Sequence, residues 1–144
     1  MRITICGSMS FAREMIDFKS ELEKMGLEVD IPGEAKDYAE DLKLKKQTEG
    51  WESLEGARRK IERDLIRAHY NKIKNSDAIF VINKDKKGIK NYIGGNSFLE
   101  IGFAYILRKK IFLLNPIPTE IPYFYQEIIA MEPIVLGGDL AKIK

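Results

Sequence analysis

Cysteine and histidine are almost absent from this sequence, which holds one of each, Cys6 and His69, in 144 residues. A lone cysteine excludes an intrachain disulfide framework and every zinc motif built from several cysteines. Because thiolate and imidazole are preferred protein ligands of zinc and related ions, we also expect no metal site.

A charge surplus and long apolar runs are also missing. Lys and Arg number 24 against 22 acidic residues, so the formal net charge is only +2, whereas general nucleic-acid binding depends on a large basic excess. No apolar run approaches the ~20 residues that a membrane span requires, and the apolar stretch within residues 1–8 is too short for a signal peptide. We therefore expect a soluble cytoplasmic protein that binds neither nucleic acid nor a membrane.

What the sequence does contain is enough apolar material for one folded domain. Hydrophobic residues make up 44% of the chain, and the length fits a single domain over residues 1–144. Residues 2–6 form a short β-rich run, after which apolar residues recur at helical spacing from Phe11 and stop at Gly26. With a further strand at 27–31, this order predicts a parallel βαβ unit.

The rest of the chain continues the alternation. Helices are expected at 57–74, 97–107 and 123–131, and strands at 78–82, 110–114 and 134–136. In the first of these helices, the residues expected to face the core are Ile61, Leu65, Ala68 and Ile73. The pattern predicts a three-layer α/β sandwich with about five parallel strands in the order 2-1-3-4-5.

The predicted strand order also predicts where a ligand binds. In open α/β sheets the site lies beyond the carboxyl ends of the strands, where the order reverses. Here that point lies between strands one and three, at the loops 7–10 and 83–97. The charged segment 33–56 is too long for an ordinary connection, so we expect a lid or binding insertion there, or else a frayed surface helix.

The loop after the first strand joins that strand to a helix. Its glycine lets the backbone approach a ligand, and the free N–H groups of the following helix attract an anion. The candidate ligand-binding residues are Gly7, Ser8, Met9, Ser10 and Arg13. The alternative is a tight turn in which Ser10 caps the helix. The segment matches neither a dinucleotide-binding nor a triphosphate-binding glycine motif.

A second glycine-bearing segment covers residues 94–104. Ser97 and Glu100 have the spacing of a capping box, in which Glu100 bonds back to the Ser97 N–H. The alternative places the Glu100 carboxylate in the crevice, where the helix N-terminus keeps it ionised as a nucleophile should be. The candidate binding residues of this segment are Gly94, Gly95, Asn96 and Ser97.

Further polar and aromatic residues lie close to these loops in the sequence. The amide of Asn115, at the end of strand four, can reach the same crevice or serve only the turn. Tyr92 and Trp51 can stack on a base or anchor a loop. A basic loop can attract phosphate or be simply solvated; its lysines are Lys84, Lys86, Lys87 and Lys90.

Two motifs resemble a known enzyme superfamily. The stretch Ser97-x-x-Glu100-Ile101-Gly102-x-Ala104, after a strand opened by Ser76-Asp77-Ala78, resembles the nucleoside 2-deoxyribosyltransferases. The opening Cys6-Gly7-Ser8 with Arg13-Glu14 is most similar to their 2′-deoxynucleoside 5′-monophosphate N-hydrolase branch. The resemblance spans nearly the whole chain in element order and implies a flavodoxin-like (Rossmann-like) fold. It also implies that Glu100 attacks the anomeric C1′ and forms a glycosyl ester without a cofactor.

Two features depart from the pattern of this superfamily. The transferases have a tyrosine in the first loop, where this chain has Cys6-Gly7-Ser8. In the hydrolase branch, an aspartate that helps to protonate the leaving base lies eight residues before Asp77, where this chain has His69. The nearest acid, Asp64, lies five residues earlier and points about 140° away on a helix. The general acid is therefore His69, Asp64 or an acid of the insertion, unless the step is lost.

Together these observations predict cleavage of the N-glycosidic bond of a (deoxy)nucleoside 5′-monophosphate or nucleoside through a glycosyl-glutamate intermediate, with release of the free base. Three alternatives stay open. The first is base exchange by a deoxyribosyltransferase, and the second is cleavage of NAD. The third is a nucleotide-binding or sensing domain in which Glu100 only caps a helix.

We also expect a homodimer. The segment 116–125 holds five large side chains that one short segment cannot easily bury in a small domain: Ile117, Ile121, Tyr123, Phe124 and Tyr125. The superfamily resemblance implies dimers whose subunits complete each other's sites, with the helix of Ala104 near the interface. The alternative is that the segment folds back over its own sheet.

Overall fold

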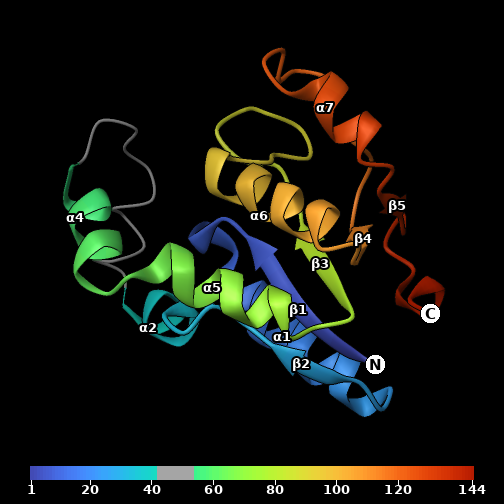
Figure 1. Ribbon diagram of the computed structural model, residues 1–144, viewed down its shortest axis with the longest axis horizontal. Helices are drawn as coiled ribbons and strands as arrows, with labels where there is room; N and C mark the ends of the chain where they lie inside the picture. Colours follow the sequence, from blue (N-terminus) through green and yellow to red (C-terminus); the bar gives the residue numbers. More distant parts are fainter. Residues whose placement is uncertain (42–53) are drawn as a thin grey trace.

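A parallel sheet of five strands forms the centre of the molecule (Figure 1). The computed structural model describes residues 1–41 and 54–144. The strands are β1 (Arg2–Gly7), β2 (Glu28–Asp30), β3 (Ala78–Ile82), β4 (Lys110–Leu113) and β5 (Ile134–Val135), in the order β2-β1-β3-β4-β5. All four neighbouring pairs are parallel. The predicted strand order is therefore confirmed.

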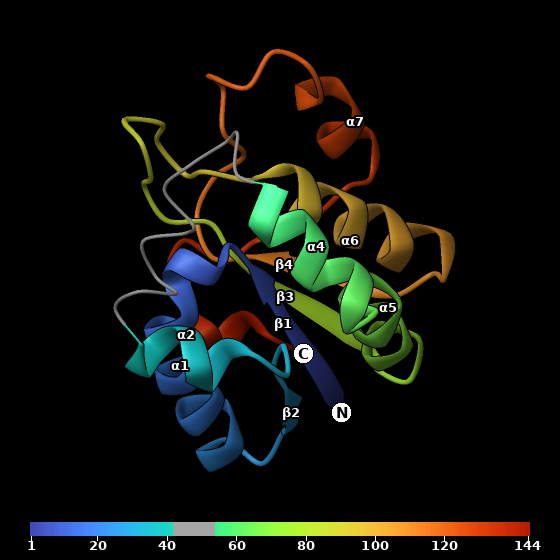
Figure 2. The same ribbon diagram turned by 90° about the vertical axis from the view of Figure 1, so that its left-hand side faces the viewer.

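Helices cover both faces of this sheet, because its central strands bury side chains on both sides. On one face, α1 (Ala12–Lys24) and α2 (Ala35–Glu40) pack with Ile3, Ile5 and Phe80. On the other, α5 (Leu65–Lys74), α6 (Gly95–Ile106) and α7 (Tyr125–Ala130) pack with Cys6, Ile79 and other residues of the strands. Figure 2 shows the two helical layers on either side of the sheet. The three-layer, flavodoxin-like architecture is confirmed.

The helix expected at 57–74 is two helices, and this part of the prediction is wrong. α4 (Leu54–Glu62) and α5 are separated at Asp64, whose φ is +49°. The bend turns α4 away from the sheet, and none of its residues is buried. Consequently Ile61, which was expected to face the core, is exposed, and Ala68 on α5 is exposed as well. A charged helix with few apolar residues gave no signal for this break.

The segment 33–56 is described only at its two ends. Before the gap it forms α2, which the sequence analysis did not predict, and after the gap α4 begins. Residues 42–53, which include Trp51, lie outside the described residues, so the lid stays a prediction. A short 3-10 helix, η2 (Leu140–Lys142), closes the chain and was also not predicted.

The segment 116–125 is largely covered by its own subunit, contrary to the expectation. Ile121 is buried, and Phe124 stacks on Phe98 of α6 with ring centroids 4.5 Å apart. Of the five large side chains of this segment, only Tyr123 is exposed, at 88%. The segment therefore folds back over α6.

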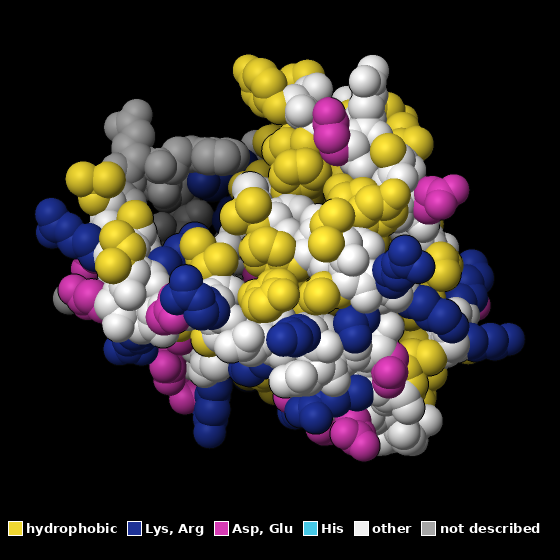
Figure 3. Space-filling view, in the orientation of Figure 1, with side chains coloured by type: hydrophobic (Ala, Val, Ile, Leu, Met, Phe, Trp, Pro, Cys, Tyr) yellow, Lys and Arg dark blue, Asp and Glu magenta, His cyan; other side chains and the backbone are white. Residues whose placement is uncertain are grey.

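The outer faces of α5 and α6 carry an exposed apolar patch. Figure 3 shows hydrophobic side chains gathered over this part of the surface. Its most exposed members are Ile66, Leu99, Tyr105 and Ile106. In residues 1–41 and 54–144, the structure contains no helix of the length and hydrophobicity needed to cross a membrane.

Candidate functional site

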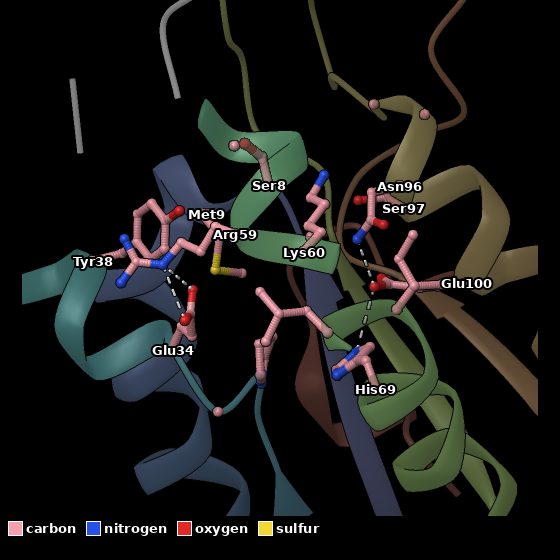
Figure 4. A pocket seen from close by; sticks show the side chains of 18 of the residues that line it. Ser8, Met9, Glu34, Tyr38, Arg59, Lys60, His69, Asn96, Ser97 and Glu100 are labelled. Atoms are coloured by element: carbon pink, nitrogen blue, oxygen red, sulfur yellow. Dashed lines mark hydrogen bonds and ion pairs between the residues drawn. The ribbon is translucent and has the colours of Figure 1, made fainter. Parts of the chain in front are cut away.

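A cavity of about 520 Å³ opens at the carboxyl ends of β1 and β3, where the strand order reverses. This volume suits a small organic ligand. The cavity is bounded by the loop after β1, the loop between β3 and α6, and residues of α4 and α5 (Figure 4). A cavity is therefore present where the strand order predicts a ligand to bind.

Glycine at the end of β1 is required by the backbone. Gly7 has a φ of +154°, and a Cβ atom there would lie 3.1 Å from the carbonyl oxygen of Ile82. A side chain would be both strained and crowded. This close packing of β1 against β3 lets Gly7, Ser8 and Met9 line the cavity.

Glu100 lies in the cavity wall on α6. That helix begins at Gly95, with Gly94 as its N-cap, two residues earlier than predicted. Ser97 and Glu100 are consequently inside the helix and do not form a capping box. The Glu100 side chain is 5% exposed, and its Oε1 accepts a hydrogen bond of 2.9 Å from Asn96 Nδ2. Its Oε2 has no hydrogen-bond partner among the described residues.

Burial determines the protonation of Glu100. Loss of hydration raises its pKa to about 8, against smaller lowering effects from Cys6, Lys60 and Asn96. The expectation that the helix N-terminus keeps this carboxylate ionised is therefore wrong for the free protein. Dehydration of a buried charge outweighs the helix dipole, whose effect is typically a fraction of a kcal/mol, about 0.3–1.

His69 and Cys6 lie directly beside Glu100. His69 Nε2 is 3.7 Å from Glu100 Oε1 and 3.4 Å from Cys6 Sγ. Burial, aided by the charge of Lys72, lowers the pKa of His69 to about 4, and burial raises the pKa of the Cys6 thiol. At neutral pH the free protein thus holds a carboxylic acid, a neutral imidazole and a thiol together. We call these three residues the buried triad.

Cations surround the mouth of the cavity. Lys86 donates a hydrogen bond of 2.7 Å to Ser8 Oγ and lies 5.2 Å from the centroid of the Tyr92 ring. We call the positively charged residues that line the cavity the cationic rim: Arg59, Lys60, Lys72, Lys86 and Lys87. The acid Glu34 also lines the cavity, but it is paired with Arg59 at 2.9 Å and with Arg63. With Glu100 protonated, the cavity has a positive surplus that favours an anionic ligand.

Most of the binding residues expected from the sequence do line the cavity. They are Gly7, Ser8, Met9, Gly94, Gly95, Asn96 and Ser97. The sequence analysis missed Arg59, Lys60 and Glu34, because their positions depend on how α2 and α4 fold over the sheet. It also gave no role to Cys6 itself, although its place at the end of a buried strand was a usable signal.

Four expected residues lie outside the cavity lining: Ser10, Arg13, Asp64 and Asn115. Asp64 is exposed at the α4–α5 bend and pairs with Arg67 at 2.8 Å, so its side chain is directed to solvent. Arg13 is exposed on α1. Ser10 also lies outside the lining, and its N–H donates to Ser8 Oγ, which makes Ser8 the capping residue.

Asn115 serves the fold. Its side-chain amide donates to the carbonyl oxygen of Asn83 at 3.0 Å, and the Asn83 amide donates to the carbonyl oxygens of Asn115 and Pro116. These bonds join the ends of β3 and β4. The interpretation of Asn115 as turn chemistry is the one the structure supports.

Comparisons with known proteins identify the fold. No protein-family model and no curated protein matches the sequence. Among solved structures, a 2-deoxyribosyltransferase from Bacillus psychrosaccharolyticus is similar with a TM-score of 0.51 and 19% identity, over 81% of this chain and 73% of that chain. A CMP N-glycosidase from Clostridium botulinum has a TM-score of 0.49 and 19% identity, over 94% of this chain and 84% of that chain. At this identity, the likeness to the transferase shows a shared fold.

Proposed function

We propose that this protein cleaves the N-glycosidic bond of a nucleoside 5′-monophosphate and releases the free base. The observation that carries the proposal is Glu100, a buried carboxyl group in the wall of a cation-lined cavity, with the neutral imidazole of His69 at 3.7 Å from its Oε1. A carboxylate nucleophile beside a proton carrier is the arrangement that covalent glycosyl transfer requires. The fold shared with a 2-deoxyribosyltransferase supports the same chemistry.

The proton held by Glu100 fits into this reaction. As a Glu100 oxygen attacks C1′, its proton passes to His69 Nε2, and the electrons of the breaking C1′–N bond move to the base. His69 then gives that proton to the base nitrogen, so the base leaves neutral and a glycosyl ester remains. Water adds to C1′ of the ester, which returns the sugar as a free hydroxyl compound and Glu100 as a carboxylic acid. No outside proton is consumed.

The cationic rim supports a phosphorylated substrate. A 5′-phosphate carries up to two negative charges. Lys86 Nζ, from the loop after β3, lies 2.7 Å from Ser8 Oγ, in the loop after β1. A Lys–hydroxyl pair donates several charge-assisted hydrogen bonds to phosphate oxygens. We assign Lys86 and Ser8 to the phosphate and the groups around Glu100 to the sugar.

A second candidate function is base exchange. The likeness to a 2-deoxyribosyltransferase favours it, since the same glycosyl ester can be resolved by an acceptor base instead of water. The two functions differ in one requirement: the transferase needs the acceptor for turnover, whereas the hydrolase does not.

The proposed function is tested by incubating the purified chain with separate nucleosides, nucleoside monophosphates and NAD, and measuring free base by chromatography. Base release from a monophosphate without an added acceptor supports hydrolysis. Release only with a second base present supports the transferase. Saturable nucleotide binding with no base release from any substrate contradicts both and supports a sensing domain.

We also propose that the chain forms a homodimer through the apolar patch on α5 and α6. Ile106 is 78% exposed and Tyr105 48%, and exposed apolar patches typically mark interfaces. Light scattering over a concentration series should give twice 16.5 kDa, and Ile106→Lys should return it to 16.5 kDa. The matched control is Met25→Lys, at an exposed methionine after α1. A wild-type species of 16.5 kDa at high concentration would exclude the dimer.

The cytoplasmic location stays a prediction.

A further inference from the structure

The buried triad has the composition and spacing of a metal site. Cys6 Sγ, His69 Nε2 and a Glu100 carboxylate oxygen lie within 4.8 Å of one another, and they come from β1, α5 and α6. The sulfur–nitrogen distance is 3.4 Å and the nitrogen–oxygen distance is 3.7 Å. A tetrahedral zinc ion with bonds of about 2.0–2.3 Å separates its ligand atoms by roughly 3.3–3.6 Å. The donor atoms are therefore spaced to hold one ion with little movement.

We propose that these three residues bind one Zn²⁺ ion, or a similar borderline-soft divalent ion, with a fourth coordination position open to the cavity. His69 and Glu100 both line the cavity, so the open position faces the space where substrate would lie. Three protein ligands and one open position are typical of a zinc ion accessible to small molecules. This proposal departs from the expectation of no metal site, which considered cysteine and histidine but not glutamate as a ligand.

The charges of the site match a divalent ion. On binding, the thiol and the carboxyl group release their protons to water, and His69 binds as the neutral imidazole. One thiolate and one carboxylate then cancel the two positive charges of the ion. The complex is neutral, which suits a site where an uncompensated charge would be costly. Mg²⁺ and Ca²⁺ prefer six or more oxygen ligands, so the thiol and imidazole select against them.

An unsatisfied polar atom points to the same conclusion. Glu100 Oε2 is buried and has no hydrogen-bond partner among the described residues. Buried polar atoms are nearly always paired, so an orphaned carboxylate oxygen in a cavity wall calls for a ligand. An ion beside His69 Nε2 would give the Glu100 carboxylate that ligand, while Asn96 keeps its hydrogen bond to Oε1.

Zinc binding would also regulate the enzyme. A carboxylate that coordinates an ion is not free to attack C1′, so ion and substrate would exclude each other at Glu100. This consequence rests on the proposed function, whereas binding of the ion does not. The zinc-bound chain would be a resting form that a stronger chelator reactivates.

Cobalt provides a direct test, because a thiolate bound to Co²⁺ gives a charge-transfer band in the near ultraviolet. The full chain, reduced and freed of metal by a chelator, is titrated with Co²⁺ under anaerobic conditions. We expect one ion per chain, the charge-transfer band, the visible spectrum of tetrahedral cobalt, and displacement by Zn²⁺. Cys6→Ser should lose the band. His69→Gln and Glu100→Gln should each weaken Co²⁺ binding at least about tenfold. Loss of a residue that only supports a metal ligand typically costs that much, and loss of a ligand should cost no less.

The controls separate binding from folding and from activity. Glu21→Gln, an exposed carboxylate on α1, should bind Co²⁺ as the wild type does, and thermal unfolding of each variant shows whether it is folded. Absence of the charge-transfer band at saturating Co²⁺, or equal affinity in folded His69→Gln, would overturn the proposal and leave only surface ions. If the chain releases base, Zn²⁺ should inhibit competitively. If it releases none, the spectra still decide the metal site.

Discussion

The buried triad and the cationic rim face the same cavity but are built in opposite ways. The triad is buried: Cys6 is completely buried, and His69 and Glu100 are 7% and 5% exposed. Part of the rim lies on α4, which has no buried residue. Arg59 of α4 and Arg63, which follows the helix, form ion pairs with Glu34.

Under the proposed function, this difference separates catalysis from substrate binding. Burial removes water from the triad and therefore shifts the pKa values of its members, which is what chemistry at carbon needs. The rim cations are half-buried or exposed, so they can attract an anion from solution, although salt screens them. Changes in the triad should alter the rate of the chemical step, and changes in the rim should alter binding. The following predictions test this division.

The largest effect is expected for Glu100→Gln. The substitution is nearly isosteric and still accepts a hydrogen bond from Asn96, so the free energy of unfolding at pH 7 should change by no more than ~1 kcal/mol. Base release should fall by about a thousandfold or more, because an amide cannot form the glycosyl ester. Steady-state kinetics with a monophosphate substrate measures this. Substantial base release by the variant would remove Glu100 from the mechanism.

His69→Gln should have the next largest effect. We expect kcat to fall about a hundredfold with little change in KM, since loss of a proton carrier typically costs that much. The discriminating substrate is a glycoside with 4-nitrophenolate as leaving group, which needs no proton. At pH 9, where Glu100 is already ionised and needs no proton acceptor, the variant should cleave it almost as fast as the wild type does. An equal loss on both substrates would instead indicate that His69 only supports the shape of the site.

A pH series of stability tests the burial of Glu100 in the metal-free protein. The unfolded chain loses this proton near pH 4.5 and the folded chain near pH 8. Because the folded state binds more protons in this window, its stability should fall as the pH rises from about 4.5 to 8. Glu100→Gln lacks the group, so its stability relative to the wild type should increase by roughly 1 kcal/mol between pH 7 and pH 9. Denaturant unfolding at pH 5, pH 7 and pH 9 measures the difference.

Protonation of His69 changes the stability in the opposite direction, and it does so at lower pH than the ionisation of Glu100. Its pKa is lowered from 6.5 to about 4, so the unfolded chain binds the proton first, and stability falls as the pH drops from about 6.5 to 4. Parallel pH profiles for the wild type and Glu100→Gln would show that the carboxyl group is hydrated in solution, contrary to its burial in the structure.

The smallest effect is expected in the rim. Lys86→Gln should reduce the preference for monophosphates over nucleosides by about tenfold, close to the value of one charge-assisted hydrogen bond. It should leave kcat on nucleosides nearly unchanged. Lys84→Gln is the matched control, because Lys84 pairs with Glu14 at 3.5 Å and does not line the cavity. Equal use of both substrate classes by the wild type would refute a phosphate site.

Sequence patterns alone predicted the order of the strands in the sheet and placed Glu100 on the helix that follows β3. Strand order follows from apolar runs such as residues 78–82 and from the fixed handedness of parallel connections. Glu100 and the loop at Gly7 are placed by that order, because ligands bind where it reverses. These are local patterns combined with one topological rule, and both can be read along the chain.

Only the folded structure shows that His69 lines the cavity and that Asp64 does not, and only the folded structure shows that Cys6 lies close to Glu100. The bend at Asp64, where φ is +49°, was not predicted from the sequence pattern. The protonation of Glu100 was likewise mistaken from the sequence, because the helix terminus is a local feature whereas burial depends on residues distant in the chain. Dehydration is a property of the assembled core, and it outweighs the local field.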